Sequence, residues 1–322
     1  MKVFASHRLP GNGLETLAQH CDLRVWPREE PVPNAELIHS LSDCDGFICL
    51  LTNRVNRDLL THCPRLRFVS SMSVGVDHVD VPALTARGIP LGNTPGVLVD
   101  TTAELALALI LAAARRIPEA DRFVRAGNWR PELPWRPDMM VGKDLAGATL
   151  GLVGLGAIGQ AVAHRAQAFG MRVIAWNRTA KDVAGVRNVS LSELLETSDV
   201  VSVHVALTEA TRNLIDANAI AAMKPGAILV NTARGGIVDE AALADALKDQ
   251  RLFSAGVDVF ETEPVEMDSP LLALENVVVA PHIGSATERT RARMADLAVA
   301  NALAALEGKP MPHCVNPEVY SA

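Results

Sequence analysis

Short apolar runs alternate with helical stretches along almost the whole chain. In the first third the runs are KVFAS, LRVW, GFICLL, RFVSSM and IPLGN, and a second series follows as TLGLVG, RVIAW, VVSVHV, AILVN, SAGVD and VVVAP. Strands buried on both faces read as continuous apolar runs, and helices between successive strands are typical of parallel sheets. The pattern therefore predicts two series of parallel strands, each covered by helices.

A long stretch with strong helix propensity separates the two series of predicted strands. It is rich in Ala and Leu over residues 100–127, and Asp100 and Thr101 are candidates for its N-cap. The segment NWRPELPWRPDMMVG that follows contains Pro and Trp and is too irregular for a helix or strand. A last helical stretch, residues 286–308, follows the final strand, and we expect it to return to the N-terminal half.

The simplest architecture is an α/β fold with two doubly wound, Rossmann-like domains, the second inserted into the first. We assign residues 1–97 and 288–322 to a flavodoxin-like substrate-binding domain and residues 98–287 to a dinucleotide-binding domain. A chain of 322 residues suits two domains of ordinary size. We expect the domains to close about the crossings near residues 97 and 287, which would exclude water from the ligands.

Composition and charge exclude several classes of protein. No apolar run approaches the roughly 20 residues that span a bilayer, and the start of the chain lacks the apolar core of a signal peptide. The net charge of −7 argues against a general nucleic-acid binder. The five cysteines have no C-x-x-C spacing and the histidines have no metal-ligand spacing, so we expect neither disulfides nor a metal site and favour the reducing cytosol.

A glycine-rich turn follows the first strand of the second series and opens an amphipathic helix, with another strand after it. Its G-x-G-x-x-G spacing allows a tight turn and a close approach of the backbone to a pyrophosphate, which the N–H groups at the start of the helix can bind. A plain strand-to-helix turn is the alternative, and the context favours a dinucleotide site. We assign the pyrophosphate to Gly154, Leu155, Gly156, Ala157, Ile158 and Gly159.

The loop after the next strand decides which nucleotide is bound. A carboxylate there would bind the ribose hydroxyls of NAD(H) and repel a 2′-phosphate, but the chain has Asn177, Arg178 and Thr179. Arginine makes charge-assisted contacts to phosphate, each worth about 1.5–3 kcal/mol. We therefore expect NADP(H) to be preferred, with NAD(H) as a weaker alternative. In the competing interpretation Arg178 lies in solvent or stacks on the adenine.

Three later strands each lead to a residue with catalytic chemistry. Arg234 follows AILVN, Glu263 lies in the loop beyond SAGVD, and His282 follows VVVAP. Each has an ordinary explanation when taken alone: an ion pair, a surface acid, and a capping or core histidine. All three at the carboxyl edge of a dinucleotide-binding sheet indicate a dehydrogenase.

The chemistry of ketone reduction matches these three residues. Hydride transfer to a ketone leaves negative charge on its oxygen, so a proton donor is needed, and His282 has a suitable side chain. A neighbouring carboxylate orients the ring and favours the imidazolium, which is the role we assign to Glu263. The guanidinium of Arg234 would bind a substrate carboxylate and polarise the adjacent carbonyl. These roles imply a 2-keto acid substrate.

The order of the motifs resembles the D-2-hydroxyacid dehydrogenase family, and within it the glyoxylate/hydroxypyruvate reductase branch. The resemblance covers nearly the whole chain through SMSVGVDHVD, NTPGVLVDTTAELALALIL, GLVGLGAIGQ, NTARGGIVDE, DVFETEP and PHIGSATERTRARM. It implies that Arg234, Glu263 and His282 are the catalytic triad, with His282 as acid/base. It also implies that the backbone N–H groups of Val74 and Gly75 bind the substrate carboxylate.

The resemblance implies further contacts and an assembly. The other substrate contacts would be Leu51, Trp135 and Ser285, together with Arg234 and His282. The nicotinamide end of the cofactor would be surrounded by Thr232, Ala233, Arg234, Asp258, His282 and Gly284, and its middle by Val205 and Thr211. Similar family members are homodimers that pair through the nucleotide domain and extend a tryptophan into the neighbour's active site. Trp135 matches that position, although ordinary packing also explains it.

Alternative functions remain open from the sequence. A 2-ketogluconate reductase of the same branch takes a larger substrate, and the pocket lining at Leu51, Thr52, Asn53 and Trp135 would decide between the two. A formate dehydrogenase is disfavoured by the carboxylate of Glu263. A cofactor-sensing, corepressor-like binding protein is disfavoured by the intact triad. We therefore expect a cytoplasmic, NADP-dependent reductase of glyoxylate and hydroxypyruvate.

Overall fold

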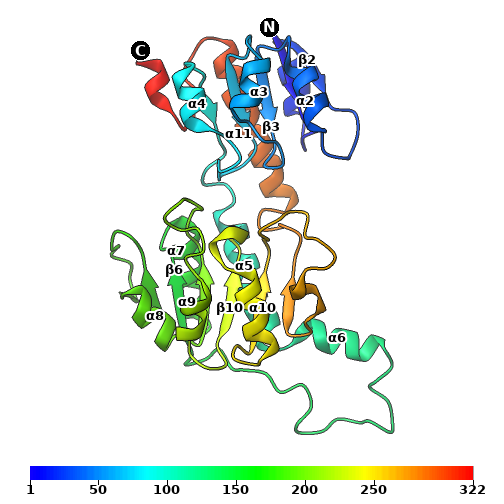
Figure 1. Cartoon of the computed structure of the whole chain (residues 1–322), viewed down its shortest axis with the longest axis vertical. Helices are drawn as coiled ribbons and strands as arrows, with labels where there is room; N and C mark the ends of the chain where they lie inside the picture. The colour runs from blue at the N-terminus through cyan, green and yellow to red at the C-terminus, as the bar shows by residue number, and fades with distance from the viewer. Residues whose placement is uncertain (322) are drawn as a thin grey trace. The chain divides into compact units, whose positions relative to one another are not determined.

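The computed structural model describes residues 1–321 and divides the chain into two compact units (Figure 1). Unit 1 comprises residues 1–98 and 286–321, and unit 2 comprises Val99–Ser285. The domain bounds predicted from the sequence differ from these by one residue at the first crossing and by two at the second. Each unit has its own sheet and its own core, so each is described by itself.

Unit 1 is built on a sheet of five parallel strands in the order β2-β1-β3-β4-β5. The strands are β1 (Lys2–Ala5), β2 (Asp22–Val25), β3 (Gly46–Cys49), β4 (Phe68–Ser71) and β5 (Leu91–Gly92). The order reverses between β1 and β3, as in flavodoxin-like sheets. Loops at the carboxyl ends of β3 and β4 therefore emerge on the edge of the sheet that binds ligands in such folds.

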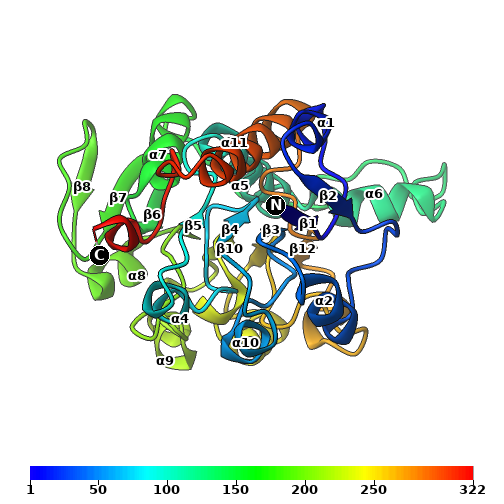
Figure 2. The ribbon, with the colours of Figure 1, turned by 90° about the horizontal axis from the view of Figure 1, so that it is seen from above.

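Helices cover both faces of the unit 1 sheet, and Figure 2 shows α1 (Gly13–Ala18) beside α11 (Glu288–Leu306) on one of them. Leu17 and Val299 pack there in a buried cluster. The other face carries α2 (Asn34–Leu41), α3 (Arg57–His62) and α4 (Val81–Ala86). The side chain of Asp80 accepts a hydrogen bond from Ala83 N and caps the start of α4. A short 3₁₀ turn, η3 (Pro317–Tyr320), follows α11.

Unit 2 contains a sheet of seven parallel strands in the order β12-β11-β10-β9-β6-β7-β8. The strands are β6 (Thr149–Val153), β7 (Arg172–Trp176), β8 (Val186–Asn188), β9 (Val200–Val203), β10 (Ile228–Asn231), β11 (Ser254–Val257) and β12 (Val277–Val279). The edge strand β8 was not predicted, because its sequence Val-Arg-Asn has no apolar run. The predicted α/β fold with two doubly wound parallel sheets is confirmed.

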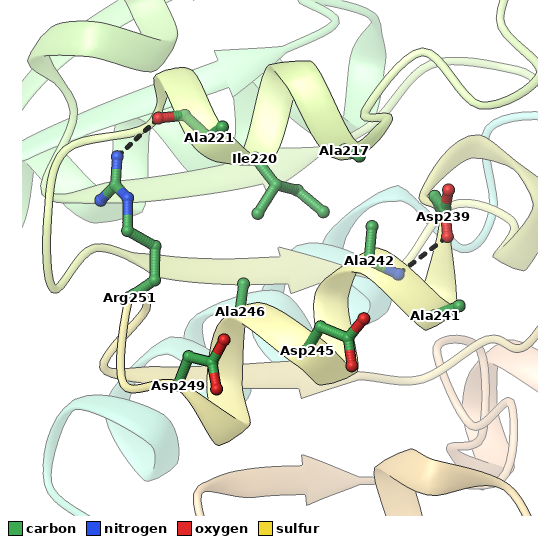
Figure 3. Close-up of a pocket in the computed structure, with 10 residues that line it drawn as sticks. All are labelled: Ala217, Ile220, Ala221, Asp239, Ala241, Ala242, Asp245, Ala246, Asp249 and Arg251. Carbon is green, nitrogen blue, oxygen red and sulfur yellow. Dashed lines mark hydrogen bonds between the residues drawn. The ribbon is translucent and has the colours of Figure 1, made fainter.

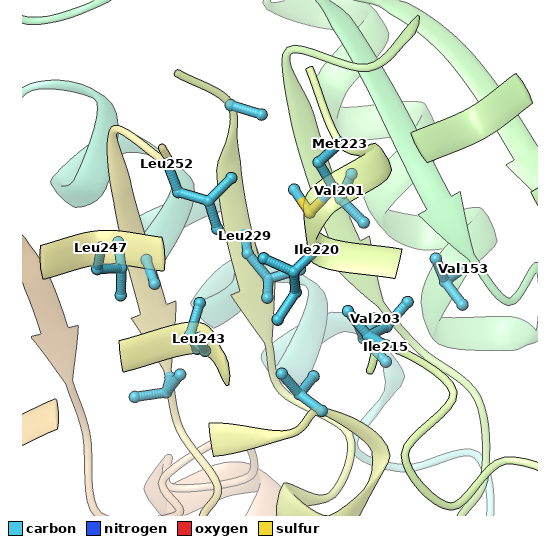
Figure 4. Packing of buried hydrophobic residues seen from close by; sticks show 14 of the residues in the cluster. Val153, Val201, Val203, Ile215, Ile220, Met223, Leu229, Leu243, Leu247 and Leu252 are labelled. Atoms are coloured by element: carbon cyan, nitrogen blue, oxygen red, sulfur yellow. The ribbon is translucent and has the colours of Figure 1, made fainter. Parts of the chain in front are cut away.

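The unit 2 sheet is also covered on both faces. Helices α5 (Val99–Ala114) and α7 (Ala157–Ala168) pack on one face. The other carries α8 (Leu191–Thr197), α9 (Ala217–Ala222) and α10 (Glu240–Lys248), and Figure 4 shows Ile220 and Leu243 directed at the buried strand residue Leu229. Two 3₁₀ turns, η1 (Gly235–Ile237) and η2 (Pro270–Ala273), follow β10 and β11.

The helical stretch predicted over residues 100–127 is two helices. A break at Arg116, which has a left-handed φ of 54°, separates α5 from α6 (Ile117–Arg125). The predicted N-cap was wrong, since α5 already begins at Val99 and Asp100 lies inside its first turn. Helix α6 and the segment after it extend away from the sheet of unit 2 (Figure 1), and residues 126–148 form no helix or strand. Within residues 1–321, no helix is both long and apolar enough for a bilayer span.

Candidate active site

The three predicted catalytic residues emerge from neighbouring strands of unit 2. Arg234 follows β10, Glu263 lies in the loop after β11, and His282 follows β12. These strands are adjacent in the sheet and all parallel, so their carboxyl ends meet at one edge. Residues far apart in the sequence are thereby brought to the edge where open α/β sheets bind ligands.

His282 and Glu263 form a direct pair. The Nδ1 atom of His282 lies 2.7 Å from Oε2 of Glu263, and the other oxygen of this carboxylate accepts a hydrogen bond from Phe260 N at 3.0 Å. Burial disfavours the charged form of Glu263, but the hydrogen bond to His282, the His282 charge and then the Arg234 charge outweigh it, so its pKa lies below the ordinary value. The carboxylate is therefore ionised, and it binds Nδ1 and leaves Nε2 of the same ring unoccupied by this pair.

Asp258 holds the turn that carries His282. His282 has a left-handed φ of 55°, and its N–H donates to Asp258 O at 2.8 Å. The two carboxylate oxygens of Asp258 accept hydrogen bonds from Ile283 N at 2.7 Å and Gly284 N at 2.8 Å. Burial raises the pKa of Asp258, and these backbone hydrogen bonds oppose that effect. The family resemblance implied that Asp258 lies near the nicotinamide. Its bracing of the turn at His282 was not predicted.

The glycine turn has the shape that a pyrophosphate requires. Gly154 has a φ of +106°, and a Cβ there would lie 2.8 Å from the carbonyl group of His204. A Cβ on Gly159 would lie 2.2 Å from Gly154 O, whereas a Cβ on Gly156 would meet nothing within 4 Å. The open side of the turn is therefore at Gly156, the N-cap of α7, whose N-terminus has no side-chain cap. Free N–H groups at a helix start bind anions, so this turn fits a phosphate group.

The loop after β7 is tied to the glycine turn by Asn177. Its Oδ1 accepts a hydrogen bond from Leu155 N at 3.1 Å, and its Nδ2 donates to Thr179 O at 2.7 Å. Arg178, between Asn177 and Thr179, is exposed, and no hydrogen bond or ion pair engages its guanidinium among residues 1–321. Asn177 therefore shapes the loop, which leaves the cation of Arg178 open to a ligand.

Other predicted cofactor residues lie at the same edge of the unit 2 sheet. The Oγ1 atom of Thr232, just after β10, is buried without a hydrogen-bond partner among the described residues, as expected of a group that awaits a ligand. Val205, just after β9, lies against the glycine turn. Burial lowers the pKa of the neighbouring His204 to about 4, so it is neutral. The hydroxyl of Thr211 is already used, since it donates to Ala206 O at 2.6 Å. Thr232 and Val205 therefore fit a dinucleotide, whereas the hydroxyl of Thr211 is engaged within its own loop.

The predicted substrate residues of unit 1 lie in loops at the carboxyl ends of β3 and β4. Leu51 is exposed, whereas Asn53 is buried and accepts hydrogen bonds from Ser6 Oγ at 2.6 Å and Leu50 N at 2.9 Å. Asn53 therefore holds its own loop. Val74 and Gly75 follow β4, and both are partly exposed.

The two remaining predicted substrate residues belong to unit 2. Ser285 is its last residue and is partly buried. Trp135 lies in the irregular segment after α6, where 72% of its surface is exposed. The structure therefore brings Arg234, Glu263 and His282 to one edge of the sheet and leaves Trp135 on the surface of unit 2.

A separate groove lies between α9 and α10 on the surface of unit 2 (Figure 3). Half of the residues that line it are alanines from these two helices, with Asp245, Asp249 and Arg251 around it. None of the residues predicted to bind substrate or cofactor lines this groove. Among residues 1–321, no cluster of three or more His, Cys, Asp or Glu side chains is arranged to hold a metal.

Comparison with known proteins identifies the family. The model of the D-isomer specific 2-hydroxyacid dehydrogenase, NAD binding domain, matches residues 107–284. The glyoxylate reductase of Korarchaeum cryptofilum is 46% identical over 322 residues, which cover 99% of this chain and 96% of that protein. The chain belongs to the D-2-hydroxyacid dehydrogenase family. Within that family it lies in the glyoxylate reductase branch, which confirms the resemblance predicted from its motifs.

Solved structures agree with this assignment. The TT0316 protein from Thermus thermophilus matches with a TM-score of 0.92 at 46% identity, over 98% of this chain and 100% of that chain. The NADPH-dependent glyoxylate/hydroxypyruvate reductase from Sinorhizobium meliloti, solved with NADP and malonate, matches with a TM-score of 0.87 at 32% identity, over 98% and 97% of the two chains. Both share the two-domain fold described above.

Proposed function

We propose that the protein reduces small 2-keto acids, glyoxylate and hydroxypyruvate foremost, to 2-hydroxy acids with NADPH. The observation that carries this proposal is the His282–Glu263 pair, 2.7 Å apart, at the edge of the sheet where the phosphate-binding turn also lies. A proton donor at the cofactor edge is what ketone reduction needs. The names of the relatives supply the substrate class.

The proposed mechanism assigns one step to each residue. When bound, NADPH supplies the hydride that adds to the carbonyl carbon of the substrate. His282 donates the proton on Nε2 to the carbonyl oxygen, because Nδ1 faces Glu263, and takes up a proton from solvent afterwards. Glu263 stabilises the imidazolium that donates. Arg234 binds the substrate carboxylate and stabilises charge on the carbonyl oxygen.

NADPH is the proposed cofactor because of the loop after β7. The guanidinium of Arg178 is exposed beside the glycine turn, and no carboxylate stands at Asn177 to repel a 2′-phosphate. The Sinorhizobium meliloti relative is an NADPH-dependent reductase whose structure contains NADP, which supports the same choice. NAD(H) remains the weaker alternative.

A homodimer that forms through unit 2 is proposed from its exposed apolar side chains. Ile117 and Val124 of α6 are each more than half exposed, as are Trp129 and Trp135 in the segment that follows. Large exposed apolar side chains gathered in one segment are typical of an interaction site. A second copy of the chain is the proposed partner.

All five cysteines are free thiols, which supports the predicted cytosolic location.

Steady-state kinetics with a substrate panel tests the proposed function. Glyoxylate, hydroxypyruvate, pyruvate and 2-ketogluconate are each assayed with NADPH and with NADH. We expect the highest kcat/KM for glyoxylate or hydroxypyruvate with NADPH. A higher value for 2-ketogluconate would identify the larger-substrate reductase instead, and no turnover with any of the four would favour a cofactor-binding protein.

A further inference from the structure

The loop after β4 presents three successive backbone N–H groups, those of Val74, Gly75 and Val76. None of the three donates a hydrogen bond within the part of the chain that the structure describes. In a trans peptide the C=O and N–H of one plane point in opposite directions. A donor that binds the carbonyl therefore also sets the direction in which the N–H points.

A separate donor binds the carbonyl of each of the three peptide planes. Thr94 N donates to Ser73 O at 2.9 Å, which fixes the direction of the N–H of Val74. Asn93 Nδ2 donates to Val74 O at 3.0 Å, which fixes the direction of the N–H of Gly75. Ser73 Oγ donates to Gly75 O at 2.8 Å, which fixes the direction of the N–H of Val76. The direction of each free N–H group is therefore fixed by the donor that binds the carbonyl of the same peptide plane.

The Ser73 hydroxyl is the last member of a chain of hydrogen bonds. Ser71 Oγ lies 2.7 Å from Ser73 Oγ and 3.0 Å from His78 Nε2. A serine hydroxyl has a single hydrogen. Ser73 uses its hydrogen on Gly75 O, so Ser71 must donate to Ser73, and His78 must donate to Ser71 from a protonated Nε2. The chain therefore runs in one direction, from His78 to Gly75 O.

Burial stabilises this chain against replacement by water. Ser71 is fully buried and Ser73 is 3% exposed. The thiol of Cys49, beside Ser71, is also fully buried, and burial raises its pKa to about 12, so it adds no negative charge. A buried hydroxyl that loses its partner has no solvent to bind instead, which makes the chain costly to break.

We propose that the hydrogen-bonded chain His78–Ser71–Ser73 positions the N–H groups of this loop to bind the carboxylate of the substrate. Ser71 and Ser73 are then positioning residues that act through Gly75. The proposal rests on the proposed function, because it takes the loop as the carboxylate site. Successive backbone N–H groups without a partner suit a carboxylate because together they bind an anion.

The test measures the binding of oxamate, a non-reacting analogue of a 2-keto acid, to the full chain saturated with NADPH. We expect Ser73→Ala to weaken oxamate binding about three- to tenfold, the effect of one neutral hydrogen bond. The KM for glyoxylate should rise by the same factor while kcat at saturation changes less than about twofold. Ser71→Ala should have a similar effect, and the double variant should show less than the product of the two.

Ser70→Ala is the matched control. Ser70 is a buried serine in β4, next to Ser71. Its hydroxyl donates to Ala298 O at 2.7 Å and takes no part in the hydrogen-bonded chain His78–Ser71–Ser73. This variant should bind oxamate like the wild type, and thermal unfolding checks that all variants fold. In the ¹⁵N spectrum of the wild type, the Nε2 atom of His78 should be protonated, which requires no variant.

The outcomes separate this proposal from the proposed function. Wild-type oxamate affinity in Ser73→Ala, an equal loss in Ser70→Ala, or an unprotonated Nε2 on His78 would overturn the positioning role. An active wild type with any of these results leaves the proposed function intact. Conversely, suppose that the variants show the expected losses of oxamate affinity while the wild type reduces no 2-keto acid. That result would support the positioning role and contradict the proposed function.

Discussion

At the scale of single residues, Arg178 is expected to decide the choice of nucleotide. Its guanidinium is exposed beside the glycine turn, and it has no partner among residues 1–321. We predict that Arg178→Ala raises the KM for NADPH about ten- to hundredfold, the loss of one or two charge-assisted hydrogen bonds. The KM for NADH should change less than about threefold, because NADH lacks the 2′-phosphate. Steady-state kinetics with both nucleotides measures the two effects.

Lys181→Ala provides the control for this experiment. Lys181 is an exposed cation further along the same loop, so its removal changes the local charge without removing the assigned phosphate contact. We expect a change of about threefold or less for NADPH. Equal losses in the two variants would show that general electrostatics, and not a specific contact of Arg178, sets the preference.

Glu263 is expected to link catalysis to stability against acid. Its pKa in the folded protein lies below the ordinary value of 4.5, because the hydrogen bond to His282 and nearby positive charge outweigh burial. The ionised form is therefore favoured by folding, so this stabilisation is fully present above the ordinary pKa and is lost as pH falls through the folded value. We predict that the wild type exceeds Glu263→Gln in free energy of unfolding at pH 7, and that the difference shrinks below about pH 4.5.

Denaturant unfolding at several pH values measures this difference, and activity provides a second readout. We expect Glu263→Gln to lower kcat by about 10²-fold or more, since the imidazolium loses its counter-charge. The same residue change at exposed Glu266, in the same loop, should alter neither quantity. A difference in stability that persists unchanged at low pH would contradict the assigned ionisation.

The residues of the site differ in how far sequence could predict them. Glu263 and His282 were predicted, and they do form a pair, because each follows a recognisable strand and parallel strands end at one edge. The bracing role of Asp258 could not be predicted, since it depends on the left-handed turn at His282 and on which N–H groups that turn exposes. The link from Asn177 to Leu155 likewise depends on how two separate loops fold.

At the scale of elements, two glycines of the turn between β6 and α7 are expected to have different roles, one in folding and the other in binding the cofactor. A Cβ on Gly159 would lie 2.2 Å from Gly154 O, whereas a Cβ on Gly156 would meet no protein atom within 4 Å. We predict that Gly159→Ala destabilises the fold by about 3 kcal/mol or more through overpacking. Gly156→Ala should lower the free energy of unfolding by at most about 1 kcal/mol. It should nevertheless raise the Kd for NADPH at least about tenfold, because its methyl group occupies the open side of the turn.

Thermal unfolding and NADPH titration of the two variants provide the measurement. The pair is matched in chemistry, since each adds one methyl group to the same turn. Tight NADPH binding by a well-folded Gly156→Ala variant would show that the pyrophosphate is not bound at this turn.

The elements themselves were largely predictable where an apolar run met helix or turn signals. Strand β8 was missed because its Val-Arg-Asn sequence is polar and lies at the edge of the sheet. The division into α5 and α6 was missed because the chain stays rich in helix-forming residues across the break, which is made by a left-handed Arg116 before Pro118. Pro118 is the signal in the sequence that could have placed this break, because proline is tolerated in the first turn of a helix but not in its interior.

At the scale of the whole molecule, the insertion of one unit into the other follows from the chain order of motifs. The last helix, α11, packs with strands of unit 1, as predicted, because the second series of strands already completes its own sheet. Helix α6 and the segment after it belong to unit 2 but extend away from its sheet (Figure 1), so some of their apolar side chains are not buried in its core. Ile117 and Val124 lie seven residues apart on α6, so they share one face of the helix, and both are exposed.

This face is the basis of the last prediction, that Ile117→Asp combined with Val124→Asp converts a dimer into a monomer. Burying each apolar side chain is worth about 1.5–3 kcal/mol, and each substitution occurs twice in a symmetric dimer, so the dissociation constant should rise about a thousandfold or more. Light scattering of the wild type and the double variant measures the mass of each. Trp135→Ala should remain dimeric, with a raised KM for glyoxylate if this side chain reaches the neighbour's site. A double variant that stays dimeric would place the interface elsewhere on the surface.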